Sequence, residues 1–523
     1  MIGFGRGRRA VKDPVRESNL FRVRAAEGFL VIALCLAVLL GRYVWLQVLR
    51  HDEFSGRADE NRIKLKPLPP SRGLIYDRNG VLLAENILDH RLEVIPEQAG
   101  DVDATLERLG QVIAISPDDR EQFDALRKVK RRFHNIPLRY ALSEQEVSRF
   151  ALERHRFPGV EVMPYLTRFY PQGSDFAHVV GYVGRIDNED RERLEEARYS
   201  ATTHIGKTGI ERYYEDLLLG EVGYERIETN AEGRALRVLG RVPSKPGRHL
   251  HLSIDARLQR AAVAAFAGRA GAAVAIDPRN GEVLAMVSQP AFDPNLFVNG
   301  ISRRNYAALI DDPRRPLYNR AVLGGYEPGS TIKPFIGFMG LRLGLRGAAD
   351  TVWSSGEYRL PGQDAVWRDW KRGGHGNVNL REALAQSVNT YFYDLAVDTG
   401  IDRIEPEMRA FGFGAPTGLD LTGEPAGVLP SRSWKQQRFG KTWYPGETVI
   451  AGIGQGYWVV TPVQLAHALA TLAARGVSHR PHLLVSLQAG IDAPAEPVVL
   501  DADAPPIEAP PEVWDAVREG MEA

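Results

Sequence analysis

The longest apolar stretch of the chain lies near its start. Residues 29–49, FLVIALCLAVLLGRYVWLQVL, carry a single charge, Arg42, and 21 residues at helical rise roughly match a ~30 Å hydrocarbon core. A cleaved signal peptide is the alternative, since the uninterrupted apolar run covers only 13 residues. The bulky residues that follow lack the small-residue cleavage site of such a peptide. We therefore expect a retained transmembrane helix, with residues 25–49 as the anchor.

The charges around this stretch indicate its orientation. Seven Lys and Arg residues precede residue 28, against three acidic residues. An excess of positive charge is typical of the cytoplasmic flank of a membrane helix. We expect residues 1–24 to form a cytoplasmic tail and everything after residue 50 to lie on the other side of the membrane.

Two stretches have the pattern of a β-hairpin. In each, apolar residues flank a turn that ends in Asn-Gly, which is a strong short-range hairpin signal. The first turn is DRNG at residues 77–80, after a proline-rich link, and the second is DPRNG at residues 277–281.

Helical periodicity is clear after Gly209. The apolar residues at i, i+4, i+7 and i+8 are Ile210, Tyr214, Leu217 and Leu218. This spacing predicts one amphipathic helix. Residues 100–160 also have charged, helix-like patterns broken by prolines, and the last twelve residues, EVWDAVREGMEA, begin another amphipathic helix.

A domain boundary is predicted near residue 248. Pro and Gly punctuate residues 243–247, and a short alternating strand and a helix follow in HLHLSIDARLQRAA. Helical patterns come after the second hairpin, so strands frame a run of helices. We expect an α+β fold for residues 248–523, separate from residues 50–247.

Composition narrows the class of protein only a little. The 523 residues suffice for two or three domains, and 44% hydrophobic and 25% charged residues are ordinary for a folded protein. A formal net charge of zero argues against a nucleic-acid-binding protein. The single cysteine, Cys35, permits no disulfide within the chain.

The segment THIGKTGIERYYED, residues 203–216, contains Gly-Lys-Thr-Gly. Its first three residues match the end of a phosphate-binding loop. Such a loop needs a further glycine where this chain has Ala201, and it follows a buried strand rather than a charged helical stretch. We therefore favour a simpler interpretation, in which Gly206 and Gly209 punctuate the entry to the helix.

The strongest chemical signal is GGYEPGSTIKPF, residues 324–335. Ser330 begins an apolar helical pattern, and one helical turn would bring the amine of Lys333 beside its hydroxyl. A serine needs a base to act as a nucleophile, and a buried lysine with a lowered pKa can serve. The helix N-terminus would also stabilise a developing oxyanion. Alone, however, Ser-x-x-Lys is usually a solvated helix face.

A second polar motif, Ser387-Val388-Asn389, lies between two helical segments. Ser387 would relay a proton between Lys333 and a leaving group, and Asn389 would hold a substrate amide. The alternative is that both residues merely cap the second helix. The order of the two motifs, their 57-residue separation and their flanks make the pair more specific than either motif.

These segments resemble the class B penicillin-binding proteins. EPGSTIKPF and SVNTYFY look like two motifs of their transpeptidase domain, and the likeness covers roughly residues 20–523. It includes PPSRGLIYDRNGVLLAEN, GKTGIERYYEDLLLG, AVAIDPRNGEVLAMVSQPAFDPN and WYPGETVIAGIGQGYWVVTPVQLAHALA. WRDWKRGGHGNVNL and SRSWKQQRFGKTWYPGE look more like the elongation subfamily, penicillin-binding protein 2, than like its division counterpart.

The resemblance implies a bitopic protein of the bacterial inner membrane. Residues 50–247 would form an elongated periplasmic pedestal of the dimerisation type, and residues 248–523 a transpeptidase domain. That domain would have a serine β-lactamase-like fold, with a central antiparallel sheet and helices. No cofactor is implied.

The resemblance also assigns roles to the four motif residues. Ser330 would attack the penultimate D-Ala of a peptidoglycan stem peptide and expel the terminal D-Ala, and an amine of a neighbouring stem peptide would take the acyl group. Lys333 would be the base, Ser387 would assist proton transfer and Asn389 would bind the donor peptide. Such a D,D-transpeptidase acts in cell elongation and is a target of β-lactams. Its expected partners are the membrane, a SEDS glycosyltransferase and rod-shape scaffold proteins.

One motif of the family is missing where the resemblance places it. Lys-[Ser/Thr]-Gly belongs on a strand after GQG at residues 454–456, but no lysine follows Lys441. The Lys-Thr-Gly at residues 207–209 lies in pedestal sequence instead. The missing strand would supply a cation and an oxyanion donor, and losing one such donor typically costs about 10²–10³ in rate. We expect a transpeptidase domain truncated at its C-terminus, with impaired activity, rather than a non-catalytic paralogue.

Two other functions and one weaker site stay open. A β-lactam-binding sensor or hydrolase would share the Ser-x-x-Lys chemistry, and a non-catalytic wall-synthesis scaffold would fit the missing motif. Asp369 and His375 are weak candidates for a metal site, because two ligands do not close one. A hydrogen-bonding role for His375 is favoured.

Overall fold

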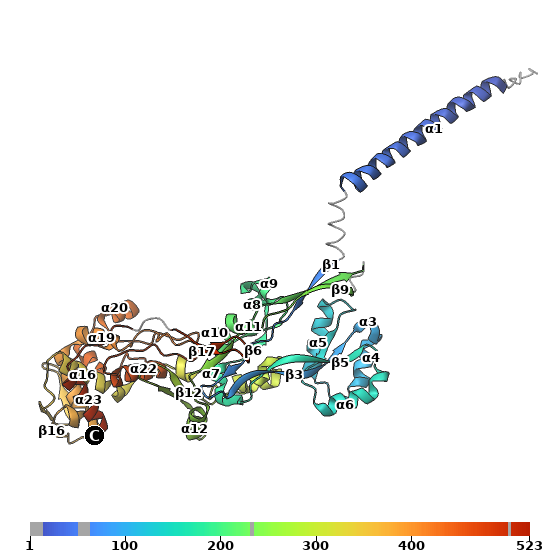
Figure 1. Ribbon diagram of the computed structural model, residues 1–523. Coiled ribbons are helices and arrows are strands. Elements are labelled where there is room, and N and C mark those ends of the chain that lie inside the picture. The colour runs from blue at the N-terminus through green and yellow to red at the C-terminus, as the bar shows by residue number, and fades with distance from the viewer. Residues whose placement is uncertain (1–13, 51–62, 231–234, 500–503) are drawn as a thin grey trace, which may run out of the picture. The chain divides into compact units, whose positions relative to one another are not determined.

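The computed structural model describes residues 14–50, 63–230, 235–499 and 504–523 (Figure 1). The chain divides into two compact units. The first combines Met1–Leu68 with Gly223–Pro243, and the second combines Pro69–Val222 with Ser244–Ala523. Residues 223–243 thus belong to the first unit although they interrupt the second.

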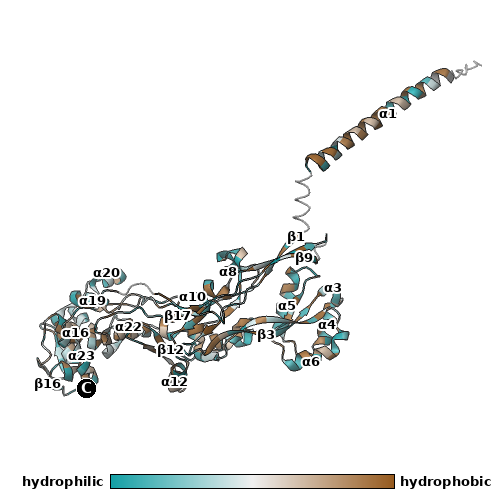
Figure 2. Cartoon of the chain, viewed as in Figure 1, coloured by the Kyte–Doolittle hydropathy of each residue, from teal (hydrophilic) through white to brown (hydrophobic). Residues whose placement is uncertain are grey.

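The apolar stretch near the N-terminus is helical. Helix α1 spans Pro14–Val44 and continues as a π-helical turn, Trp45–Leu49. Ser18–Leu49 is long and apolar enough to cross a membrane, and no residue of its most apolar window is buried. Brown, hydrophobic residues run along much of this helix in Figure 2. The guanidinium of Arg42 lies 4.3 Å from the centroid of the Trp45 ring, a pair suited to the membrane interface. The helix fits the single-pass anchor that the sequence predicts.

The first unit also contains a three-stranded antiparallel sheet in the order β1-β8-β9. Its strands are β1 (Ile63–Leu68), β8 (Gly223–Thr229) and β9 (Ala235–Val242). Ile63 pairs with Glu228, and Leu68 pairs with Gly223. The segment after the anchor is therefore held to residues 223–243 by the pairing of β1 with β8.

A seven-stranded sheet is the largest sheet of the second unit. Its order is β18-β17-β10-β2-β3-β4, and β5 also pairs with β3. The strands are β2 (Ile75–Tyr76), β3 (Leu82–Val94), β4 (Ile136–Arg139), β5 (Val160–Phe169), β10 (His249–Leu252), β17 (Leu484–Gln488) and β18 (Ala495–Pro497). Strands from both halves of the sequence share this sheet, so the predicted boundary near residue 248 falls inside it.

The first predicted hairpin is confirmed. Strands β2 and β3 are antiparallel, with Ile75 opposite Ala84, and Gly80 has a φ of 83° in the turn. The Asp77 carboxylate is fully buried and accepts hydrogen bonds from the amides of Asn79 (2.8 Å) and Val81 (2.7 Å). It also accepts one from the Ala256 amide, 3.0 Å away at the start of α12 (Ala256–Phe266). One aspartate therefore forms the turn and anchors a helix 179 residues later.

The charged segment at residues 100–160 forms helices, as its pattern predicts. These helices pack around a core of their own. Ser116 and Ser143 begin two of them with capping boxes, in which each serine and the acid three residues later bond one another's amides. The helices are α3 (Pro96–Ala99), α4 (Val102–Leu109), α5 (Pro117–Val129) and α6 (Glu144–Glu153), followed by a 3₁₀ turn, Arg154–Arg156. Phe123 and Phe150 are buried in the core that these helices form with β3, β4 and β5.

The prediction of one helix after Gly209 is wrong, because the segment forms two short helices. Helix α10 (Gly209–Tyr213) ends at Tyr214, whose φ of −105° and ψ of 27° are not helical, and α11 (Glu215–Leu219) follows. The close approach of backbones explains both glycines. A Cβ on Gly206 would lie 2.0 Å from the carbonyl oxygen of Glu211, and Gly209 has a φ of +62°. Lys207 forms an ion pair with Asp187, 2.8 Å away, so this Lys-Thr-Gly is structural.

Several short elements connect strand β5 to this segment. They are the 3₁₀ turn Gly173–Phe176, α7 (Ala177–Val180), β6 (Val183–Arg185), α8 (Asn188–Arg193), α9 (Glu196–Tyr199) and β7 (His204–Gly206). Strands β6 and β7 pair antiparallel.

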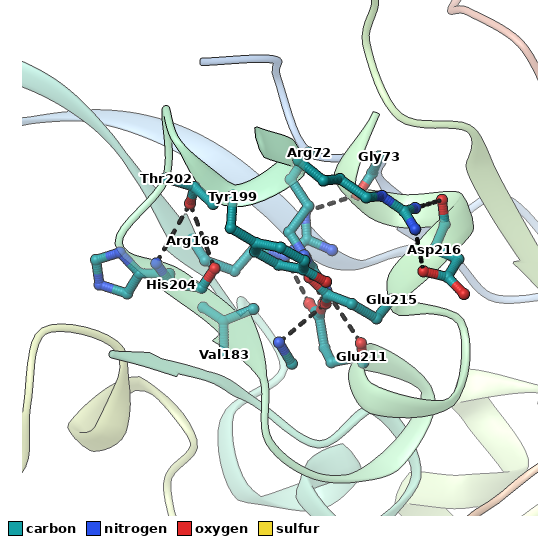
Figure 3. A network of polar contacts seen from close by, with 12 residues as sticks. Arg72, Gly73, Arg168, Val183, Tyr199, Thr202, His204, Glu211, Glu215 and Asp216 are labelled. Carbon is teal, nitrogen blue, oxygen red and sulfur yellow. Dashed lines mark hydrogen bonds and ion pairs between the residues drawn. The ribbon is translucent and has the colours of Figure 1, made fainter. Parts of the chain in front are cut away.

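Glu211 of α10 lies at the centre of a buried ionic network (Figure 3). The Glu211 carboxylate accepts hydrogen bonds from Nε of Arg72 (2.6 Å), Nε of Arg168 (2.7 Å) and the Tyr170 hydroxyl (3.2 Å). Arg72 also reaches Glu215, 2.6 Å away. Burial alone would raise the pKa of Glu211, but the two arginines outweigh it and lower that pKa. Three segments distant in sequence, around Arg72, Arg168 and Glu211, are joined through one carboxylate.

We expect Glu211→Gln to destabilise the pedestal by about 3–5 kcal/mol, because it leaves two buried arginines without their shared counter-charge. Thermal unfolding of the full chain in detergent would show a transition at a lower temperature. Glu153→Gln is the matched control, since its pair with Arg156 is at the surface and should change stability by less than about 1 kcal/mol. Equal effects of the two variants would contradict this expectation.

The second predicted hairpin is also confirmed. Strands β11 (Gly271–Ile276) and β12 (Val283–Gln289) pair antiparallel, and Gly281 has a φ of 81° in the turn. Helix α12 packs on β12, and α22 (Pro462–Ala473) packs on β11. Among the described residues these two strands form a sheet of their own. Strands and helices together give the predicted mixed α+β fold.

A helical core surrounds α16 (Lys333–Arg342). This helix is apolar on all sides, and its residues from Lys333 to Gly340 are buried. Phe338 stacks against Trp514 of α23 (Pro511–Glu522), with ring centroids 4.1 Å apart, which confirms the helix predicted at the end of the chain. Because the residues of α16 from Lys333 to Gly340 are buried, the helix carries the amine of Lys333 into the interior.

The remaining described helices and strands complete the second unit. The helices are α13 (Asn295–Val298), α14 (Arg303–Ile310), α15 (Arg320–Leu323), α17 (Leu380–Ala385), α18 (Asn389–Thr399), α19 (Ile401–Ala410), α20 (Arg432–Phe439) and α21 (Pro445–Ala451). Two short antiparallel pairs are β13 (Val352–Ser354) with β16 (Gly376–Val378) and β14 (Glu357–Arg359) with β15 (Val366–Arg368).

Candidate active site

Ser330 lies at the surface, immediately before the buried helix α16. It belongs to a single 3₁₀ turn, Gly329–Ile332, rather than to the α-helix itself. Gly329 has a φ of 55°, and its amide donates to the carbonyl of Gly454, 2.9 Å away. A Cβ on Gly454 would lie 2.3 Å from the Gly329 carbonyl oxygen. The glycines of GQG at residues 454–456 thus let a second loop hold the serine turn in place.

The Lys333 amine is bound by the second polar motif. Nζ of Lys333 donates to the Ser387 carbonyl (2.8 Å), the Ser387 hydroxyl (3.1 Å) and Oδ1 of Asn389 (2.7 Å). It also lies 5.5 Å from the centroid of the Phe392 ring. Within the described part of the chain, its hydrogen bonds go to these two residues and not to Ser330. The structure therefore brings Lys333, Ser387 and Asn389 into contact, and Ser330 lies in the turn immediately before Lys333.

The backbone at Ser387 is strained in a way that serves this contact. Ser387 has a φ of 53°, in the left-handed region that residues other than glycine rarely adopt. It lies between α17 and α18, and its carbonyl and hydroxyl both reach the same amine. Asn389 begins α18, and its side chain is engaged by Lys333, so this motif does more than cap a helix.

The electrostatics of Lys333 favour a base. Burial lowers its pKa to about 8, against the opposing effect of the Asp369 carboxylate. A neutral amine has a lone pair that can accept a proton, and with a pKa of about 8 roughly a tenth of Lys333 is neutral at pH 7.

Asp369 and His375 belong to a hydrogen-bonded cluster beside the second motif. Nε2 of His375 lies 3.3 Å from Oδ1 of Asp369, and Nδ1 lies 3.0 Å from Oε1 of Gln386. The other oxygen of Asp369 accepts from the Thr390 amide (3.0 Å) and hydroxyl (3.3 Å). Among the described residues, no group of three or more His, Cys, Asp and Glu side chains has the arrangement of a metal site. The contacts are those of a cluster that fixes the start of α18, one residue from Asn389.

A groove of about 660 Å³ opens next to the serine turn. It runs between β11 and α22 and includes Tyr326, Glu327 and Pro328, so it ends beside Ser330. Its walls are mostly small apolar residues of the strand and the helix. Glu327 also accepts a hydrogen bond from the Gly456 amide (3.1 Å), which ties the same loop to GQG.

Sequence reasoning missed several of these supporting residues. Thr390, Ser354 and Gln386 had no signal, because their role depends on contacts with residues up to 36 positions away. Glu327 lies within the Ser-x-x-Lys segment and could have been noticed as a polar residue in an apolar, glycine-rich stretch. The contact between Gly329 and Gly454 was hinted at by the glycines of GQG.

Comparison with known proteins agrees with this geometry. The family model "Penicillin-binding Protein dimerisation domain" matches residues 67–252, and "Penicillin binding protein transpeptidase domain" matches residues 271–521. The chain is 45% identical over 514 residues to the peptidoglycan D,D-transpeptidase MrdA of Escherichia coli K12, which covers 98% of this chain and 81% of the relative.

Solved structures give the same answer. The structure of Pseudomonas aeruginosa PBP2 with WCK 5153 is 40% identical, with a TM-score of 0.67 over 88% of this chain and 80% of that one. The complex of Helicobacter pylori PBP2 with MreC is 31% identical, with a TM-score of 0.73 over 88% and 83%. A peptidoglycan synthase complex matches at 32% identity and a TM-score of 0.65, over 95% and 84%.

The chain belongs to the class B penicillin-binding proteins, with a dimerisation domain and a transpeptidase domain. Within that class it is similar to the MrdA proteins, which are named as D,D-transpeptidases, and to solved PBP2 structures.

We expect Thr390→Val to destabilise this part of the protein by about 1–3 kcal/mol. The substitution keeps the size of the side chain but removes the hydroxyl that Asp369 and Ser354 contact in a buried environment. Thermal unfolding of the full chain would measure the change. Thr351→Val, at an exposed position nearby, is the control and should have almost no effect. If Thr390→Val left the thermal stability unchanged, the cluster would not stabilise the start of α18.

Proposed function

We propose that this protein is a peptidoglycan D,D-transpeptidase of cell elongation, which cross-links stem peptides through an acyl-enzyme on Ser330 and is a target of β-lactams. The observation that carries the proposal is the exposed Ser330 at the head of a helix whose Lys333 amine is buried and bound to Ser387 and Asn389. The 45% identity to a relative named as a peptidoglycan D,D-transpeptidase supports it.

The proposed acylation begins with a neutral Lys333. Lys333 accepts the proton of the Ser330 hydroxyl as the oxygen attacks the carbonyl of the penultimate D-Ala, and the bond to the terminal D-Ala breaks. Ser387, which already contacts Nζ of Lys333, passes a proton to the leaving amine. Asn389 holds a substrate amide with its side chain. An amine of a second stem peptide then attacks the ester, which forms the cross-link and frees Ser330.

The third family motif enters this proposal as a requirement. No described strand beside Ser330 carries Lys-[Ser/Thr]-Gly, and the groove between β11 and α22 lies open at the serine turn. We propose that a polypeptide of these 523 residues acylates slowly, since a strand with a cation and a backbone donor would have to supply the oxyanion contact. A wall-synthesis scaffold without catalysis is a second candidate function. A sensor or hydrolase remains a third candidate, which turnover of penicillin would reveal.

The membrane arrangement and the partners are part of the proposal. We place residues 1–24 in the cytoplasm, 25–49 in the inner membrane, and the pedestal (50–247) and transpeptidase (248–523) domains in the periplasm. The positive charge before the apolar helix supports this orientation. A rod-shape scaffold protein and a SEDS glycosyltransferase are proposed partners. The complex of a similar PBP2 with MreC and the similar peptidoglycan synthase complex support them.

If Lys333 is the base, acylation should speed up as pH rises through about 8. Below that pKa the neutral fraction of the amine falls about tenfold for each pH unit, so the acylation rate at pH 6 should be far lower than at pH 8. Stopped-flow acylation by a chromogenic β-lactam would measure this profile. Thermal unfolding across the same range is the control for loss of the fold. A rate that does not change between pH 6 and pH 9 would rule out Lys333 as the titrating base.

Labelling with a fluorescent penicillin tests the nucleophile and the missing strand together. We expect residues 1–523 to be labelled at Ser330 only slowly, at about 10²–10³ below the rate of the same chain extended with the C-terminal segment of an MrdA relative. Ser330→Ala should abolish labelling of both forms. Thr351→Ala, at an exposed position outside the serine turn, is the control and should be labelled like its parent. Equal labelling of the short and extended chains would contradict the requirement for the third motif.

A further inference from the structure

A second cavity lies in the pedestal, away from Ser330. Its volume is about 490 Å³. Segments distant in sequence meet around it: the link at residues 69–72, strands β3 and β5, the loop at residues 201–204, and Val298 of α13. Val298 lies in the part of the chain that matches the transpeptidase family model, and the other segments match the dimerisation model. A ligand in this cavity would contact both parts.

The wall of this pedestal cavity is positively charged. Its charged residues are Arg72, Arg91 and Arg168, and no acidic residue is among the described residues that line it. Their counter-charges, Glu211, Glu215 and Glu93, are not part of the lining. Arg185 stacks 4.6 Å from the ring centroid of Tyr140, which does line it. The cavity therefore offers positive charge without a negative group of its own.

One buried donor in this wall lacks a partner within the described part of the chain. Arg168 uses Nε for Glu211 and Nη1 for Gly73 and Asn86, which leaves Nη2 buried without a hydrogen bond. Its side chain is only 2% exposed. His204 lines the same wall, and its ring forms a hydrogen bond with the Val298 backbone. Figure 3 shows Arg72, Arg168 and His204 gathered in this region. Buried donors of this kind are rare in native proteins and require an explanation.

The ionisation of His204 is consistent with the positive environment. Burial, together with the positive charges of Arg185, Arg72 and Arg91, lowers the pKa of His204 to about 4 and outweighs a hydrogen bond with the Val298 backbone, which raises that pKa. Its imidazole is therefore neutral at pH 7. Ser71, Asn86 and Thr202 are among the other polar residues of the lining. Such a set of donors suits the oxygens of an anion.

We propose that the pedestal cavity binds the phosphate or carboxylate group of a small ligand, with Nη2 of Arg168 as a donor to its oxygens. Binding there would join the dimerisation and transpeptidase parts through Val298 and would stabilise the folded state in proportion to the ligand concentration. This site is separate from the proposed acylation site and does not depend on it.

Calorimetric titration of the full chain in detergent, at physiological ionic strength, tests the proposal with two probes. Sodium phosphate represents the phosphate source and sodium citrate the carboxylate source. We expect saturable binding of at least one probe. Arg91→Gln and Arg185→Gln should each weaken it about tenfold, because each removes a positive charge at the cavity without breaking the Arg168–Glu211 pair. Arg156→Gln, an equal change of charge at the surface of the same domain, should leave binding unchanged.

Absence of saturable binding for both probes would overturn the proposal. An equal loss in Arg156→Gln would do the same, because it would show binding to general surface charge. If an arginine variant does not fold, NMR of histidine-labelled wild-type protein decides. The His204 ring signals should shift on addition of the bound probe, while those of exposed His155 should not. Unshifted His204 signals would contradict the assignment of the cavity.

Discussion

The buried amine of Lys333 is the constraint on which the rest of the candidate active site depends. An ammonium or amine inside a protein must have hydrogen-bond partners, or its burial is strongly unfavourable. Here three oxygens of Ser387 and Asn389 surround it. To place two of those oxygens, Ser387 adopts a left-handed backbone conformation between two helices. Asp369 then holds the start of α18 through Thr390 and also raises the pKa that burial lowers. Each feature follows from the need to hold one amine in the core.

The pedestal is organised around a carboxylate in the same way. Glu211 is fully buried, and it is stable there as an anion because Arg72 and Arg168 share it. The three residues come from segments far apart in sequence, so the network forms only when those segments are in place. The close backbone packing around it leaves no room for a side chain at Gly206. This explains why a segment that looks like a phosphate loop or a catalytic motif is a packing motif instead.

Much of the local structure could be predicted because it depends on neighbours in sequence. Both Asn-Gly turns form hairpins, and capping serines begin the pedestal helices. The one clear error is the helix after Gly209, which breaks at Tyr214. Its apolar spacing is helical, but the hydroxyl of Tyr214 bonds Asp420, 2.9 Å away and 206 residues later. Periodicity reports which residues are buried and does not report which distant groups they must reach.

The sequence by itself determined the apolar anchor, the hairpin turns and the identity of four candidate residues, since each depends on spacing within a short segment. Only the tertiary structure decided that Lys333 bonds the second motif rather than Ser330, and that Asp369 and His375 form a hydrogen-bonded cluster. It also decided where the arginines of the pedestal meet. The physical reason is the same in each case. Burial and electrostatic pairing depend on which distant segments pack together, and a short stretch of sequence contains no record of that packing.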